Sequence, residues 1–247
     1  MKTYVVNMEK DTHKRELITK QLAQHPELDW QIWKAVEGRK LSEQEQTELI
    51  LPEFKQRYGK SATLPAAGCS LSHASIYKDM LDIDVPYAMI IEDDAILAKS
   101  LKMESFIPLL SREVPTAILL TPDFRYKKSD KYLQIGESSV YCLDNGLMTS
   151  GYLINNAAAK LLSDNLMPIK YLADAWADFV NMGLHLYGVT PHLVSFPDEL
   201  GEIGLSQRQQ YNHSHLSVRR FLGYAHWKMY NWYLWIKGYR RASKLWR

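Results

Sequence analysis

The chain has 247 residues, of which 46% are hydrophobic and 23% charged, a composition that excludes an intrinsically disordered or fibrous protein and fits one large domain with a small appendage. Two cysteines are too few for a disulfide-stabilised secreted scaffold and suit a reducing compartment. No stretch reaches 18 uninterrupted apolar residues, and the apolar start is too short for a signal peptide. We therefore expect neither a transmembrane helix nor a secretory leader.

Predicted strands and helices alternate along the chain. Short apolar runs predict strands at residues 3–8, 30–36, 87–91, 117–121, 151–155, 186–190 and 193–195, and a strand or hairpin arm at 134–142. Helical patterns cover residues 13–24 (capped by Asp11 or Thr12), 68–81, 157–165 and 174–182, and a polar helix-prone stretch at 41–58 is interrupted at Pro52. The alternation predicts an α/β fold with a mainly parallel sheet, whose ligands collect at the carboxyl ends of the strands.

Three consecutive acids, Glu92, Asp93 and Asp94, follow the apolar run at 88–91. Their carboxylates repel one another unless a cation lies among them, and Mg²⁺ or Mn²⁺ prefers such oxygen ligands and bridges to phosphate. The sequence therefore predicts a metal at a strand end, facing a phosphorylated substrate; the alternative is an acidic loop that caps a helix. Since the chain has no glycine-rich dinucleotide motif and no Walker loop, a nucleotide would be held by metal and side chains.

Charge is distributed unevenly along the chain. Residues 203–247 contain nine Lys or Arg and no acid, so the other 202 residues carry 21 basic and 28 acidic residues, a formal charge of −7. A basic tail on an acidic body indicates an anionic partner for the tail. On a helical wheel, residues 218–247 place most of their aromatic residues on one side and most of their cations on the other, a pattern typical of an interfacial helix at a membrane. The alternative is that the apolar side packs on the main domain.

Several ordered sequence blocks resemble glycosyltransferase family 25, whose bacterial members build lipopolysaccharide or lipooligosaccharide cores. The blocks are Tyr4–Met8 with Arg15, Ala35–Gly38, Gly68–His73, Ile91–Asp94, and Gly151–Ile154 with Ala159–Leu162. They span about residues 3–195, and the tail beyond Gln207 lies outside the resemblance. The chain departs from the family at Glu202-Ile203, where many relatives have a Ser-Asp-Ile-like segment.

The resemblance implies a GT-A-like α/β fold in residues 1–205, followed by a basic aromatic helical segment at 206–247. It also implies an inverting hexosyltransferase that moves galactose from UDP-galactose to a lipid-linked oligosaccharide acceptor, with Mn²⁺ or Mg²⁺ to neutralise the diphosphate. Two alternatives stay open. One is another metal-dependent phosphate enzyme, and the other is a non-enzymatic nucleotide-sugar-binding scaffold at the membrane.

The resemblance also assigns candidate site residues. Asp94 is the first choice for a metal ligand, and Glu92, on the same side of an extended segment, shares the metal or contacts the ribose. His192 is a further candidate ligand. Asp174 and Asp178, four residues apart on one predicted helix face, are candidates for the general base, with Asp174 preferred and helix capping as the alternative.

The remaining candidates are expected to bind the donor: Asn7, Arg15, Ser72, His73, Glu92 and Asp93. For His73 the alternative is a structural histidine within a helix. Arg15 would contact phosphate, or lie on the surface without a role. Asp93 points away from Asp94 in an extended segment, which is compatible with a structural role. Cys69 is expected to be a small buried hydrophobe rather than a nucleophile. The expected location is the cytoplasmic face of the inner membrane, with no nucleic-acid partner.

Overall fold

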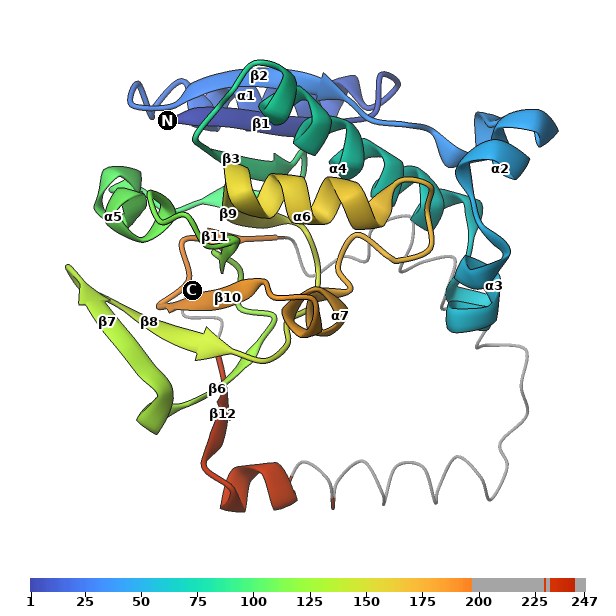
Figure 1. Cartoon of the computed structure of the whole chain (residues 1–247). Coiled ribbons are helices and arrows are strands. Elements are labelled where there is room, and N and C mark those ends of the chain that lie inside the picture. Colours follow the sequence, from blue (N-terminus) through green and yellow to red (C-terminus); the bar gives the residue numbers. More distant parts are fainter. Residues whose placement is uncertain (197–228, 230–231, 243–247) are drawn as a thin grey trace.

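The computed structural model describes residues 1–196, 229 and 232–242 (Figure 1). Its centre is an eight-stranded sheet in the order β2-β1-β3-β9-β5-β10-β8-β7. The strands are β1 (Lys2–Asn7), β2 (Asp29–Lys34), β3 (Tyr87–Glu92), β5 (Thr116–Leu119), β7 (Lys131–Ile135), β8 (Ser138–Leu143), β9 (Gly151–Asn155) and β10 (His185–Thr190). Only β8 and β9 run against the others, so the expected α/β fold with a mainly parallel sheet is confirmed.

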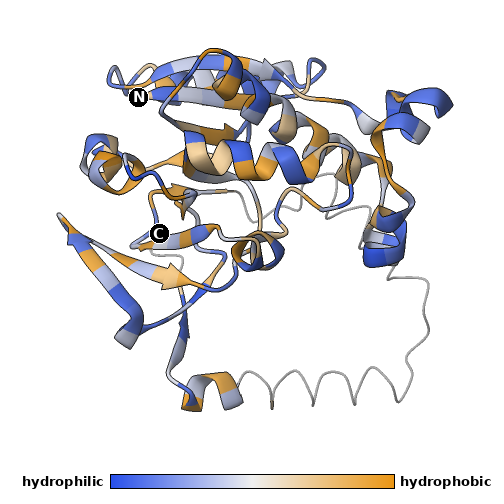
Figure 2. Cartoon of the chain, viewed as in Figure 1, coloured by the Kyte–Doolittle hydropathy of each residue, from blue (hydrophilic) through white to orange (hydrophobic). Residues whose placement is uncertain are grey.

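Helices cover both faces of this sheet. They are α1 (Thr12–Leu22), α2 (Glu43–Leu49), α3 (Pro52–Tyr58), α4 (Leu64–Asp82), α5 (Ile107–Leu110), α6 (Asn156–Leu166) and α7 (Trp176–Asn181), with 3-10 turns η1 (Gly38–Lys40), η2 (Gly59–Ser61), η3 (Met103–Phe106) and η4 (Lys128–Asp130). Helices α4, α6 and α7 pack on one face of the sheet, and α1 and α5 pack on the other. Figure 2 shows hydrophobic residues on the central strands and along α4 and α6.

Helix α4 begins four residues before the predicted start at Gly68. Thr63 caps it by accepting a hydrogen bond from the Ala66 amide, and Pro65 occupies the first turn, where its missing N–H costs nothing. Asn155 caps α6 in the same way, through Ala158 N. The predicted cap of α1 is different, because Asp11 occupies the cap position without a side-chain capping bond.

The carboxyl ends of β1 and β3 lie together at one edge of the sheet. The register pairs Val6 with Glu92, and the next antiparallel strand, β9, begins at this edge because Gly151 pairs with Ile91. Beyond this edge, the short strands β4 (Ile96–Leu97) and β11 (Val194–Ser195) pair with each other. The acidic run therefore lies at the edge where ligands collect in α/β sheets.

The end of the chain returns to the main domain. Residues 232–236 are helical, Gly238 takes a φ of +85°, and β12 (Tyr239–Arg241) pairs antiparallel with β6 (Arg125–Lys127). The helical-wheel pattern predicts a helix over residues 218–247; a positive φ at Gly238, which glycine tolerates, ends the helix and lets the chain continue as a strand. The Glu202-Ile203 segment and most of the expected basic helix lie outside the described residues. Among the described helices, none is long and apolar enough to cross a bilayer.

Candidate functional site at the carboxyl edge of the sheet

The acidic run forms a tight turn. Strand β3 ends at Glu92, and the amide of Ala95 donates a 3.1 Å hydrogen bond back to the Glu92 carbonyl, which leaves Asp93 and Asp94 in the middle of the turn. The expectation that alternating residues of an extended segment point to opposite sides therefore does not apply here. Asp93 and Asp94 instead approach the same cation, Lys14.

Lys14 of α1 is the cationic partner of the turn. Its Nζ lies 3.4 Å from Asp93 Oδ1 and 3.9 Å from Asp94 Oδ2. Burial lowers the pKa of Lys14, but the carboxylates of Asp93 and Asp94 outweigh burial and raise it overall. Lys14 therefore stays charged and offsets part of the negative charge of the turn. Sequence analysis missed this residue, although it immediately precedes Arg15 in a recognised block.

Asn7 and Arg15 hold the turn from behind. Asn7 donates from Nδ2 to Asp93 Oδ2 at 2.7 Å, and its Oδ1 accepts a 2.8 Å hydrogen bond from Arg15 Nε. Arg15 also donates to the carbonyl oxygen of Glu9. Asn7 is buried, and both ends of its amide are engaged. In this structure Asn7 and Arg15, which were predicted to contact the nucleotide sugar, position Asp93.

Glu92 faces helix α4 and the segment that precedes β9. Its Oε1 accepts a 2.7 Å hydrogen bond from Thr149 Oγ1 and lies 3.9 Å from His73 Nε2. Burial first, and then the charge of Asp94, raises the pKa of Glu92 to about 7; Asp93 and Asp174 add to the effect, and the Thr149 hydrogen bond opposes it. Burial and the neighbouring acids make the charged form of Glu92 unfavourable, and a bound cation would stabilise that form. Carboxylates with such a raised pKa are typical of functional sites.

His73 is fully buried behind Glu92. Its Nδ1 lies 2.7 Å from the Tyr152 hydroxyl, which is itself 2.6 Å from the Tyr77 hydroxyl. Burial lowers the pKa of His73 to about 4, so the ring is neutral at physiological pH and its contact with Glu92 is not an ion pair. His73 therefore supports the site from within the core and does not face a substrate directly.

Ser72 has a packing role. Its buried Oγ donates a 2.7 Å hydrogen bond to the Gly68 carbonyl and accepts a 2.8 Å one from the Val36 amide. The hydrogen bond from Val36 joins two of the blocks that carry the resemblance, 35–38 and 68–73. The same two blocks also meet where Gly68 packs against Gly38. With a buried hydroxyl engaged on both sides, Ser72 offers no contact to a donor here, in contrast to the expectation from sequence.

Asp174 and Asp178 do not share a helix face, which corrects the prediction. Helix α7 begins at Trp176, so Asp174 lies in the preceding loop, where its Oδ2 accepts a 3.1 Å hydrogen bond from the Met148 amide. Asp178 lies in the first turn of α7 and pairs with Arg57 Nη1 at 2.9 Å. Asp174 contributes to the raised pKa of Glu92, which places its charge within reach of the acidic turn.

His192 follows β10 at the same edge of the sheet and is buried. Among the described residues, the group of His, Cys, Asp and Glu side chains whose ligand atoms all lie within 4.8 Å of one another consists of Cys69, His73 and Glu92. His192 and Asp94 are outside it. The set Asp94, Glu92 and His192 is thus not assembled as a ligand cluster, and a metal role for Asp94 stays a prediction.

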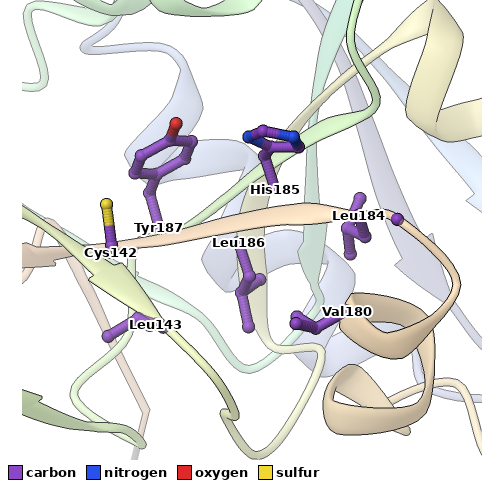
Figure 3. Close-up of a pocket in the computed structure, with 8 residues that line it drawn as sticks. Cys142, Leu143, Val180, Leu184, His185, Leu186 and Tyr187 are labelled. Carbon is purple, nitrogen blue, oxygen red and sulfur yellow. The ribbon is translucent and has the colours of Figure 1, made fainter.

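A cavity of about 230 Å³ lies elsewhere, between the end of α7 and strands β8 and β10 (Figure 3). His185 and Tyr187 project from one side of β10, and Leu186 from the other. His185 starts β10 next to Pro115, at the amino edge of the parallel strands and hence opposite to the acidic turn. With no acid in its lining, this cavity is not the site that would hold a metal and a diphosphate.

The sheet is mainly parallel, is flanked by helices and carries an acidic turn at its carboxyl edge, as expected from the sequence. Residues 1–177 match the family model described as glycosyltransferase family 25 (LPS biosynthesis protein). The chain belongs to this family.

Two curated relatives are procollagen galactosyltransferases 1-B and 1-A of Xenopus laevis, each 26% identical to the chain. The alignments cover 77% of this chain and 35% of each relative, so the chain spans about a third of their length.

Three solved structures are also similar. A glycosyltransferase involved in the glycosylation of the major capsid of PBCV-1 is 12% identical, with a TM-score of 0.32, and the match covers 66% of this chain and 63% of that one. The galactosyltransferase LgtC in complex with donor and acceptor sugar analogues is 11% identical, with a TM-score of 0.37 and coverage of 89% and 98%. UDP-glucose pyrophosphorylase complexed with UDP-glucose is 8% identical, with a TM-score of 0.44 and coverage of 86% and 99%. Likeness at this level carries no inference about the site.

Proposed function

We propose that the chain transfers galactose from UDP-galactose to a sugar of a lipopolysaccharide or lipooligosaccharide core, with inversion at the anomeric carbon and with Mn²⁺ or Mg²⁺ at the acidic turn. Family membership supports the reaction class, and the names of the curated relatives support the sugar. The family's description as LPS biosynthesis proteins supports the proposed acceptor.

One observation carries the proposed metal. Asp94 Oδ1 is buried and has no hydrogen-bond partner among the described residues. A buried carboxylate oxygen without a partner is costly, and a divalent cation would satisfy it. The residues present therefore fit the ion: Asp94 would hold it, with Glu92 as the second oxygen donor. When bound, the ion would neutralise the diphosphate leaving group.

The protein's own residues supply the remaining parts of the proposed reaction. Lys14 adds a fixed positive charge beside Asp93 and Asp94. Asp174 takes the proton of the acceptor hydroxyl as that oxygen attacks the anomeric carbon, and the bond from this carbon to UDP breaks on the opposite side. Asp174 is the better base than Asp178, because the carboxylate of Asp178 is already paired with Arg57.

The reaction can be tested with a panel of UDP-hexoses and Mn²⁺, with and without a truncated lipooligosaccharide acceptor, by measuring UDP release. We expect release from UDP-galactose that the acceptor stimulates and that Asp94→Asn abolishes. Release without any need for acceptor would indicate the alternative hydrolase. Absence of release together with absence of UDP binding would contradict the proposal, whereas binding without release would favour the scaffold.

We further propose that the chain works at the cytoplasmic face of the inner membrane, docked through its C-terminal segment. Five large apolar side chains there are more than half exposed: Met229, Trp232, Tyr233, Trp235 and Ile236. Arg240 lies 5.2 Å from the Trp235 ring and Lys237 lies 5.7 Å from the Tyr233 ring, so cations accompany the aromatic residues. Aromatic rings beside cations suit the headgroup region of an anionic membrane.

Vesicle sedimentation tests this docking. Binding to vesicles that contain phosphatidylglycerol should fall at least tenfold in the double variant Trp232→Ser/Trp235→Ser, and weaken with added salt. The matched control is Leu147→Ser, which removes an exposed apolar residue elsewhere on the surface. Equal binding of the wild type to neutral and anionic vesicles, or no binding at all, would contradict the proposal.

A further inference from the structure

Cys69, His73 and Glu92 form a cluster that the proposed transfer reaction does not use in full. Cys69 and His73 are four residues apart on α4 and so lie on one face of the helix, and Glu92 reaches them from the end of β3. One ligand atom of each, the thiol sulfur, an imidazole nitrogen and a carboxylate oxygen, lies within 4.8 Å of the other two. Thr149 closes this group, because its hydroxyl contacts Glu92 Oε1 at 2.7 Å and Cys69 Sγ at 3.9 Å.

The second observation is an unsatisfied nitrogen aimed into this cluster. His73 is fully buried, and its Nε2 has no hydrogen-bond partner among the described residues, although it faces Glu92 Oε1 at 3.9 Å. Its other nitrogen, Nδ1, is held by the Tyr152 hydroxyl at 2.7 Å. When Nδ1–H donates to that hydroxyl, Nε2 presents a lone pair to the cluster. Metal-binding histidines are commonly oriented by a hydrogen bond at the second nitrogen in this way.

We propose that Cys69, His73 and Glu92 form a binding site for a transition metal ion of the Zn²⁺ class, which shares Glu92 with the Mn²⁺ or Mg²⁺ site expected at Asp94. The three donor types, thiolate, imidazole and carboxylate, are those of zinc sites, whereas Mg²⁺ takes oxygen ligands alone. Ligand atoms around tetrahedral zinc are separated by about 3.3 Å for nitrogen and oxygen. The present 3.9 Å between His73 Nε2 and Glu92 Oε1 needs only a small side-chain contraction.

The neighbouring groups explain how the ion would be held. Tyr77 and Tyr152 orient the imidazole, and Thr149 orients the carboxylate. On binding, the Cys69 thiol loses its proton to solvent as the sulfur–metal bond forms, and Glu92 loses its own where it is protonated, so at least one proton is released for each ion bound. The ion would then tie the middle of α4 to the carboxyl end of β3. It would also hold the Glu92 carboxylate, so that excess Zn²⁺ competes with the use of Glu92 in the donor site.

The test uses Co²⁺ as a spectroscopic probe of the full chain after treatment with a chelator. Co²⁺ bound by a thiolate gives a near-ultraviolet sulfur-to-metal charge-transfer band. In the wild type we expect this band to saturate at one Co²⁺ per protein. Its intensity should fall at least tenfold in Cys69→Ser and in His73→Gln. It should be fully retained in Cys142→Ser, which removes the exposed second cysteine. Retention of the band in Cys69→Ser, or its loss in Cys142→Ser, would overturn the proposal.

A second measurement needs no variant and covers the case in which Cys69→Ser does not fold. In the wild type, Zn²⁺ should slow alkylation of Cys69 at least tenfold and leave that of Cys142 unchanged, as measured by mass spectrometry of the two peptides. Equal rates with and without Zn²⁺ would overturn the site. Asp94→Asn should keep the Co²⁺ band while it loses transfer activity, so the failure of either proposal is distinguishable from the failure of the other.

Discussion

Gly38 and Gly68 pack backbone against backbone: a Cβ on Gly68 would stand 2.6 Å from the amide nitrogen of Gly38. A Cβ on Gly38 would in turn stand 1.8 Å from the carbonyl oxygen of Leu64. This contact joins two sequence blocks that are 30 residues apart and fixes the position of α4. Because α4 carries Cys69 and His73, the contact also sets how these side chains approach Glu92.

Gly38→Ala should therefore destabilise the fold by about 3 kcal/mol, since backbone on both sides leaves no room for a methyl group. The free energy of unfolding from urea denaturation measures this. Gly59→Ala is the comparison, because a Cβ there meets nothing within 4 Å and adds only the strain of a positive φ. If the free energy of unfolding falls equally in both variants, the close contact between Gly38 and the backbone of α4 is not what requires glycine at position 38.

Asp94→Asn should lower kcat for transfer by about 100-fold or more and leave the fold intact, because it removes a charged ligand of the proposed ion. UDP release and the Mn²⁺ concentration for half-maximal activity are the readouts. Asp82→Asn removes an exposed acid at the end of α4 and should leave both unchanged. An active Asp94→Asn protein with an unchanged Mn²⁺ requirement would exclude Asp94 as the ligand.

Glu92→Gln should stabilise the metal-free protein at pH 8 and have little effect at pH 5. The pKa of Glu92 is raised to about 7 in the fold, above its ordinary 4.5, so the folded state holds this proton more tightly than the unfolded state. Ionised Glu92 therefore lowers the free energy of unfolding. This loss of stability is complete above pH 7, shrinks as the pH falls from 7 to 4.5, and is absent below pH 4.5. We expect a gain of roughly 1–3 kcal/mol at pH 8. Thermal unfolding at both pH values measures it, and an equal gain at both would contradict the assignment.

Tyr152→Phe should cost about 1–3 kcal/mol of stability, because it leaves His73 Nδ1 and the Tyr77 hydroxyl without their shared partner in the core. Tyr77→Phe removes only the outer bond of this chain and should cost less. Chemical denaturation of the two variants gives the comparison. A larger loss for Tyr77→Phe would mean that the hydroxyl of Tyr152 is not the central member of the network.

Asp174→Asn should lower kcat by about 100-fold or more if Asp174 is the base, with little change in UDP binding. Asp178→Asn should have a small effect on kcat, since its carboxylate is engaged by Arg57 at 2.9 Å. Transfer rates of the two variants, with UDP binding measured on the same preparations, provide the decisive readout. The reverse order of effects would assign the role to Asp178.

Local patterns in the sequence determined the elements of the fold. The apolar run at 88–91 followed by three acids predicted a strand that ends in a carboxylate turn, and strand β3 with its turn is what forms. Alternating strands and helices predicted the α/β class, and the ordered blocks identified the family. These inferences succeed because the periodicity of strands and helices, and the residues of a motif, are contiguous in sequence.

Only the tertiary structure decided what each acid faces. Lys14 lies beside Asp93 and Asp94, Thr149 beside Glu92, and Tyr152 beside His73, and each partner comes from another element. The start of α7 at Trp176 likewise separated Asp174 from Asp178, although their spacing fits one helix face. Contacts between distant elements depend on sheet order and helix packing, which no local pattern encodes, and they set which side chains are buried, paired or open to a ligand.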